Sequence, residues 1–250
     1  MYQNERELEI RKILLQKGYA SVQELSQWLY TSPSSVRRDL ASLEKQGLVK
    51  RSYGGAEPVK NSSQILPFST RAHQNIPAKK AMARKAAKMV PDGAIVFLDQ
   101  SSSAFFVACE LQGRADLTVV TNNVEILSLL GQSKLEVIAC GGRLSRSNRN
   151  CLLGSDAQDT FSQIHADIVF FSAKALSSDG VIWDCDREEV CLRQSMLQNA
   201  HKRVFLCASE KFPLQAGYRQ CTLEDVDCMI TEAESSAAFS QLGPLASKII

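Results

Sequence analysis

Apolar and polar residues recur at helical spacing between residues 32 and 47. Ser32 is a favoured helix-capping residue, and Pro33 follows it at the first helical position, where its missing N–H breaks no hydrogen bond. The apolar positions are three or four residues apart and fall on one side of such a helix; they are Val36, Leu40 and Leu43. The pattern predicts one short helix with an apolar face and a polar face.

The polar face begins with two hydroxyls and two guanidinium groups, from Ser34, Ser35, Arg37 and Arg38. Hydroxyls and the open N–H groups of a helix start suit phosphate oxygens, and an arginine fork matches the paired acceptors of a guanine edge. The face therefore favours binding to a polyanion. Arginine pairs also occur on ordinary solvated surfaces, so the neighbouring segments decide between the two interpretations.

Those segments predict a helix-turn-helix at about residues 20–39. Ser21 and Glu24 form a capping box that opens a second helix, and the short turn Tyr30-Thr31 closes it. The apolar side of that helix is expected to contain Val22, Leu25, Trp28 and Leu29. Residues 5–17 predict a supporting helix. Two short helices joined by a tight turn, with the second basic at its start, are typical of DNA-binding proteins.

A two-stranded wing is expected after the second helix. Residues 48–51 and 56–59 read as short strands on either side of Tyr53-Gly54-Gly55, a glycine turn. Three helices and a wing make a small domain over residues 1–58. We expect DNA contacts from the helix start and from the basic residues around the wing: Ser32, Ser34, Ser35, Arg37, Arg38, Lys45, Lys50, Arg51 and Tyr53.

The rest of the chain alternates short apolar runs with helical patterns. The runs, rich in β-branched and aromatic residues, are 94–98, 117–121, 135–139, 168–171, 204–207 and 226–230. The helical patterns between them are 102–112, 122–131, 156–164 and 187–201, after a first one that starts at residue 77. This alternation predicts a mainly parallel sheet covered on both faces, a Rossmann-like α/β domain over residues 77–250. Residues 59–76, which contain prolines and serines, predict a linker.

Charge divides the chain in the same way. Residues 1–90 carry sixteen Lys and Arg against seven Asp and Glu, a net of +9, whereas residues 91–250 carry thirteen against twenty, a net of −7. The first part suits a nucleic-acid partner. Eight cysteines form no C-x-x-C pair and several lie in apolar runs, so we expect reduced, buried thiols and neither a metal nor a cofactor. No apolar stretch is long enough to span a bilayer, which predicts a cytoplasmic protein without a membrane partner.

Ligands of parallel sheets bind beyond the carboxyl ends of the strands, and these exits carry polar groups. The first exit combines an acid with three hydroxyls at a helix start, a credible phosphate cradle. The loops after the later strands add the amide of Asn122, the glycine pair 141–142 and three cationic side chains. The residues expected to bind an effector are Asp99, Ser101, Ser102, Ser103, Thr121, Asn122, Gly141, Gly142, Arg143, Lys174 and Lys211. Each taken singly also has a plainer explanation as a cap, turn or surface residue.

The first module resembles the DeoR family of bacterial transcriptional regulators, over residues 3–58. The family's runs TIRRDL, LEKQG and HGGA correspond here to SVRRDL, LEKQGLVKR and YGGA, with Tyr53 in place of the usual histidine. The resemblance implies a winged helix-turn-helix that binds double-stranded operator DNA.

The second module resembles the same family to about Glu232. The matching runs are LDQSSS at 98–103, VVTNN at 119–123, CGGRL at 140–144, LLGSDA at 152–157, FFSAKALSSDGV at 170–181 and ASEKF at 208–212, with Glu189. The resemblance implies a fold like ribose-5-phosphate isomerase and glucosamine-6-phosphate deaminase that senses a phosphorylated metabolite. The departures are Ser101-Ser102-Ser103 for the family's Gly-Thr-Thr, Lys174 for a small residue and Ala208 for an aspartate.

Our leading hypothesis is a metabolite-responsive regulator, most simply a repressor, that acts as a dimer or tetramer on a symmetric or repeated operator. The alternative is a sugar-phosphate isomerase or deaminase fused to a DNA-binding head, with acid and base groups drawn from Asp99, Asp184, Asp186, Glu188, Glu189 and Lys211. Against it, none of the three histidines lies at a strand exit. A third hypothesis makes Asp184-Cys185-Asp186 and Cys191 a redox or metal switch.

Overall fold

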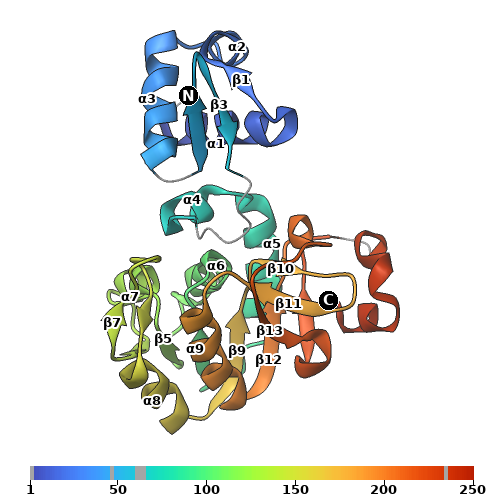
Figure 1. Cartoon of the computed structure of the whole chain (residues 1–250). Helices are drawn as coiled ribbons and strands as arrows, with labels where there is room; N and C mark the ends of the chain where they lie inside the picture. The colour runs from blue at the N-terminus through green and yellow to red at the C-terminus, as the bar shows by residue number, and fades with distance from the viewer. Residues whose placement is uncertain (1–2, 46–47, 60–65, 234–235) are drawn as a thin grey trace. The chain divides into compact units, whose positions relative to one another are not determined.

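A computed structural model describes residues 3–45, 48–59, 66–233 and 236–250 (Figure 1). The chain divides into two compact units, Met1–Gln74 and Asn75–Ile250. The expected boundaries placed a linker at residues 59–76. Part of that segment, Phe68–His73, is helix α4 and belongs to the first unit, where Leu66 joins the apolar core.

The first unit is a helical head with a small sheet. Its elements are α1 (Gln3–Lys17), β1 (Ala20–Ser21), α2 (Val22–Trp28), α3 (Pro33–Lys45), β2 (Val49–Ser52), β3 (Gly55–Pro58) and α4. Ile10 and Leu14 of α1 pack with Val36, Leu40 and Leu43 of α3, all at most 2 % exposed. The predicted apolar stripe of α3 is therefore its buried face. Within the described residues, the predicted helices and wing strands all form; residues 46–47, the expected end of the helix that starts at Ser32, lie outside the described residues.

Two details of the head differ from expectation. The wing belongs to a three-stranded sheet in the order β1-β3-β2, because the short strand β1 pairs with β3, Ala20 opposite Ala56. Gly55 permits this approach, since a Cβ there would lie 2.4 Å from the Ala20 carbonyl oxygen. Trp28 is not in the core: it is 38 % exposed, and the Lys17 ammonium lies 4.1 Å from its ring centre.

A buried ion pair fixes α3 on α1. Asp39 is fully buried on α3, and its two carboxylate oxygens accept hydrogen bonds from Arg6 of α1 at 2.5 and 3.0 Å. These hydrogen bonds raise the pKa of the Arg6 guanidinium. The pair holds Asp39 on the inner side of α3 and so sets the rotation of the helix about its own axis. Arg38, the preceding residue, is then directed to solvent.

The second unit is an α/β domain. Its helices are α5 (Ile76–Ala87), α6 (Ser102–Leu111), α7 (Val124–Leu130), α8 (Ser155–Gln163) and α9 (Arg187–Gln198), with 3₁₀ segments η1 (Ser209–Lys211), η2 (Leu223–Asp225) and η3 (Ser236–Lys248). Its strands are β4 (Ile95–Leu98), β5 (Thr118–Thr121), β6 (Glu136–Ala139), β7 (Arg143–Leu144), β8 (Leu152–Leu153), β9 (Ala166–Phe171), β10 (Ala175–Leu176), β11 (Val181–Asp184), β12 (Ala200–Leu206), β13 (Tyr218–Thr222) and β14 (Cys228–Ile230).

The main sheet has six strands in the order β14-β12-β9-β4-β5-β6, and every pairing is parallel. Alternate residues of β9 point to opposite faces. Ile168 and Phe170 pack with α5, α6 and α7, whereas Val169 and Phe171 pack with α8 and α9. The predicted parallel sheet with helices on both faces is confirmed, and because every pairing is parallel, the carboxyl ends of all six strands lie along one edge.

Short antiparallel strands were missed. A second sheet has the order β10-β11-β13, and β7 and β8 form a hairpin. Residues 200 and 201, the expected end of the helix over 187–201, instead begin β12, where Ala200 lies opposite Ala166 of β9. Tertiary pairing overrides the polar sequence of that segment. Every helix in the described ranges is too short or too polar to span a membrane.

We expect Asp39→Asn to destabilise the head by about 1–3 kcal/mol, because Arg6 loses a charged acceptor inside the protein. Hydrogen exchange of α3 amides in the full chain, followed against denaturant, measures the change. Glu44→Gln, on the same helix as Asp39, is the control. It removes the charge of an exposed ion pair with Arg51 of β2 and should cost at most about 1 kcal/mol. Equal protection in both variants would contradict a positioning role for Asp39.

Candidate functional sites

The start of α3 presents the predicted polar groups to solvent. The Ser32 hydroxyl accepts a hydrogen bond from the Ser35 N–H at 3.2 Å, so Ser32 is the helix cap. Its oxygen also lies 2.9 Å from the hydroxyls of Ser34 and Ser35. Arg37 and Arg38 are exposed on the face opposite the buried stripe. Hydroxyls and guanidinium groups are therefore accessible at the same helix end.

The wing and the end of α3 carry the remaining residues predicted to contact DNA. Tyr53 is fully exposed at the turn between β2 and β3, where Gly54 adopts a φ of +79°. Lys50 and Arg51 on β2 are exposed, and each has an acidic neighbour: the Lys50 amine lies 3.7 Å from Glu57, and Arg51 lies 2.8 Å from Glu44. Lys45 is exposed at the end of α3. Tyr30, at the turn before α3, is 97 % exposed and was not among the predicted DNA contacts.

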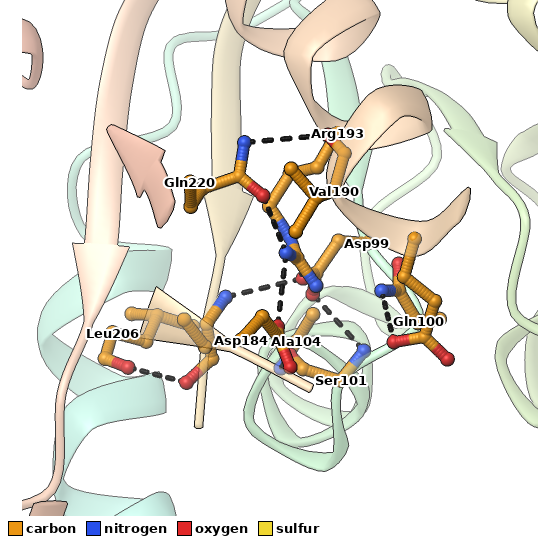
Figure 2. Close-up of polar contacts among 12 residues, drawn as sticks. Asp99, Gln100, Ser101, Ala104, Asp184, Val190, Arg193, Leu206 and Gln220 are labelled. Carbon is orange, nitrogen blue, oxygen red and sulfur yellow. Dashed lines mark hydrogen bonds and ion pairs between the residues drawn. The ribbon is translucent and has the colours of Figure 1, made fainter. Parts of the chain in front are cut away.

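In the second unit, the sheet edge holds a cluster of buried polar side chains (Figure 2). Asp99, directly after β4, is fully buried. One of its oxygens accepts a hydrogen bond from the Ser101 N–H at 3.0 Å, and the other accepts from the Arg193 Nε at 3.0 Å and the Ser172 N–H at 3.2 Å. A carboxylate with these partners serves to order the exits of β4 and β9.

Arg193 of α9 is the centre of this cluster. The side chain is 1 % exposed and contacts Asp99, Asp184 at 3.0 Å and the Gln220 amide oxygen at 2.7 Å. Burial lowers the pKa of Arg193, but the nearby carboxylates Asp184, Asp99 and Glu189 outweigh it and raise the pKa above its ordinary value. The guanidinium is a permanent cation that neutralises two acids at strand ends.

A second chain of hydrogen bonds links the exits of β4 and β5 to α9. Asn122 donates to the Gln100 amide oxygen at 3.3 Å, and Gln100 donates to Glu189 at 2.8 Å. The other oxygen of Glu189 accepts from Asn148 at 2.9 Å. Asn122 is fully buried, and its side-chain oxygen has no hydrogen-bond partner among the described residues.

The predicted hydroxyls at the edge are mostly structural. Ser101 caps α6 by accepting from the Ala104 N–H at 3.0 Å, and Thr121 donates to the Leu98 carbonyl oxygen at 2.7 Å. Ser101, Ser102 and Ser103 are only 3–7 % exposed. The predicted cradle is thus part of a closed core.

The predicted cations and glycines lie around this core. The Lys211 ammonium donates to the Ser172 hydroxyl and to the Ala173 carbonyl oxygen, both at 2.7 Å, which ties the exit of β12 to that of β9. Lys174 is half-buried, and its backbone N–H donates to the Trp183 carbonyl oxygen at 3.0 Å. Gly141 and Gly142 connect β6 to β7, and a Cβ on Gly142 would lie 2.4 Å from the Leu153 carbonyl oxygen. Arg143 forms an exposed ion pair with Glu188.

The structure therefore brings together Asp99, Asn122 and Lys211 with four residues that the exits alone did not indicate: Gln100, Asn148, Ser172 and Arg193. Arg193 had a signal in the sequence. It lies three residues after Val190 and three before Met196, so it falls on the apolar face of α9.

The cysteine hypothesis loses support from this geometry. Cys185 is buried, and burial raises its pKa to about 11; burial likewise raises the pKa of Cys140 and Cys207 to about 12. Thiols with a pKa this high are poor nucleophiles. Within the described ranges, no group of three or more His, Cys, Asp or Glu side chains is arranged to hold a metal ion.

A head with an exposed basic helix and wing, joined in one chain to a parallel α/β domain with polar strand exits, defines a DNA-binding regulator with a sensor domain. Comparisons with known families agree. The family model described as DeoR-like helix-turn-helix domain matches residues 6–62, and the one described as DeoR C terminal sensor domain matches residues 74–233. The chain belongs to the DeoR family of transcriptional regulators.

Similar proteins cover nearly the whole chain. The HTH-type transcriptional regulator GolR of Listeria innocua is 32 % identical over 96 % of this chain and 94 % of its own length. The glycerol-3-phosphate regulon repressor of Escherichia coli is 29 % identical over 97 % and 96 %. Among solved structures, ribose 5-phosphate isomerase A from Methanocaldococcus jannaschii has a TM-score of 0.40 at 18 % identity, over 53 % of this chain and 52 % of that one. The chain is a regulator, and the alternative of a sugar-phosphate enzyme is set aside.

We expect Arg193→Met to destabilise the second unit by about 3–5 kcal/mol, because two carboxylates at the sheet edge lose their buried cation. Denaturant unfolding followed by a probe in the second unit measures the loss. Arg187→Met on the exposed side of α9 is the control and should stay within about 0.5 kcal/mol of the unchanged chain. Adding Asp184→Asn to Arg193→Met should restore part of the stability; a further loss would count against charge pairing as the cause.

Proposed function

We propose that this protein is a repressor of a carbohydrate-metabolism operon and that a phosphorylated sugar or related metabolite releases it from the operator. The observation that carries the proposal is the exposure of Arg37 and Arg38 on a helix whose rotation the Arg6–Asp39 pair fixes. The name of the Escherichia coli relative, a repressor of a glycerol-3-phosphate regulon, supports both the direction of control and the class of effector.

In this proposal the start of α3 enters the major groove. Arg37 and Arg38 contact base edges and phosphates. The hydroxyls of Ser32, Ser34 and Ser35 contact the DNA backbone. The flanking DNA backbone is contacted by the remaining predicted residues, Lys45, Lys50, Arg51 and Tyr53. Lys50 and Arg51 exchange their exposed acidic neighbours for phosphates, which costs little because exposed ion pairs are weak. A homodimer or homotetramer in the cytoplasm would place two heads on half-sites of one operator.

Effector binding is proposed at the carboxyl edge of the sheet. The residues are those expected from the strand exits: the loop at 99–103, whose serine side chains form the buried base of the edge, the groups at 121–122 and 141–143, and the two lysines 174 and 211. Coupling of about 1–3 kcal/mol between this site and the operator would change operator affinity by roughly 5- to 150-fold.

An electrophoretic mobility shift with the promoter DNA next to the protein's own gene tests the proposal. We expect a shifted band that survives excess competitor DNA and disappears with the correct sugar phosphate. Arg37→Ala should lower discrimination between operator and competitor by about 1–3 kcal/mol, because a base contact is lost. Lys12→Ala, an exposed cation on α1, is the matched control. Binding without any preference over competitor DNA would refute the proposal.

A further inference from the structure

A basic pocket lies beside the β7–β8 hairpin. Its volume is about 470 Å³, within the range of small-molecule sites. The lining residues are Arg143, Leu144, Ser145, Arg146, Ser147, Arg149 and Glu188. Three guanidinium groups and one carboxylate give the lining a net charge of +2, although the second unit as a whole is acidic. The sign of this charge selects an anionic ligand.

The loop between β7 and β8 is held by its buried residues. The Ser145 hydroxyl, 1 % exposed, accepts from the Asn148 N–H at 3.1 Å. The Asn148 side chain, 3 % exposed, donates to Glu189, and the Ser147 hydroxyl donates to Asp186 at 2.9 Å. The arginines at every third position, 143, 146 and 149, are exposed. A fixed backbone thus presents three guanidinium groups to one pocket, which lowers the entropic cost of gathering them around a ligand.

Glu188 occupies part of this pocket as an internal anion. Its carboxylate pairs with Arg143, and both side chains are about half exposed, 55 % and 53 %. An exposed pair of this kind contributes little stability. A phosphate dianion offers the same guanidinium a bidentate partner with more charge. An incoming phosphate can therefore displace Glu188.

Glu188 also connects the pocket to the buried cluster. It lies in the first turn of α9, next to Glu189, which bonds to Gln100 and Asn148, and five residues before Arg193, which bonds to Asp99. A ligand that moves Glu188 acts on the helix that orders the exits of β4 and β9.

We infer that this pocket binds the phosphate group of the effector through Arg143 and Arg146, with Glu188 as the residue that the phosphate replaces. The inference rests on the proposed function for its effector and refines where the phosphate binds: at the arginines of the β7–β8 loop, not at the serine loop 101–103, whose side chains are buried.

Titration of the full chain with inorganic phosphate, and with sugar phosphates beside their unphosphorylated parents, tests the inference by calorimetry at constant ionic strength. Arg143→Ala and Arg146→Ala should each weaken phosphate binding by about ten- to hundredfold. Lys134→Ala is the control for lost charge, because Lys134 is exposed at the opposite, amino-terminal end of β6.

Glu188→Gln should tighten phosphate binding by about two- to fivefold, because the competing carboxylate is gone. Glu110→Gln, an exposed acid on α6, is the matched control and should leave the affinity unchanged. Unphosphorylated sugars should bind neither the unchanged chain nor the variants with this dependence on arginine.

Three results would overturn the inference. The first is that phosphate and sugar phosphates do not bind the unchanged chain, and the second is that the arginine variants bind them as the unchanged chain does. The third is that the arginine variants lose only operator binding, which would assign the pocket to DNA. Mobility shifts without effector separate the two proposals. If Arg143→Ala binds the operator and is still released by the sugar phosphate at unchanged concentration, the pocket assignment fails while the repressor function stands.

Discussion

The buried ion pairs of Arg193 are the interaction on which the sensor domain depends. Removing a guanidinium and two carboxylates from water is costly unless they pair closely and their remaining hydrogen bonds are satisfied. Here Asp99, Asp184 and Gln220 supply that pairing from the exit of β4, from β11 and from β13. One side chain on α9 therefore joins the parallel sheet to the small antiparallel sheet, and it orders the loop that follows β4.

The parallel sheet was predictable because its strands are covered on both faces. Runs such as 168–171 then read as continuous apolar segments, and only core packing explains them. The hairpin β7–β8 and the sheet β10-β11-β13 were not predictable in the same way. Their strands have two to five residues, partly exposed, and the first half of β12 contains the polar residues 201–203. Strand pairing, not local composition, decides those segments.

The candidate sites divide along a similar line. In the head, Arg37 and Arg38 could be placed on the exposed face because the stripe of α3 leaves no other orientation. At the sheet edge, Asp99, Asn122 and Lys211 followed from topology alone, since parallel strands end together. Arg193 and Asn148 did not follow. A charged or polar residue in a helix or loop is ordinarily interpreted as solvated. The spacing of Arg193 from Val190 and Met196 indicates its buried side, but only the fold shows its partners Asp99, Asp184 and Gln220.

The order Arg37-Arg38-Asp39 has a consequence for how such a protein changes its target. Outward arginines and an inward carboxylate occupy successive positions, so a turn of α3 that redirects the arginines would pull Asp39 away from Arg6 and into solvent. The residue that holds α3 in place is therefore distinct from the side chains that α3 exposes. In the proposed complex with DNA, exchanges at residues 34, 35 and 37 would therefore change the contacts to the operator while the Arg6–Asp39 pair stays in place.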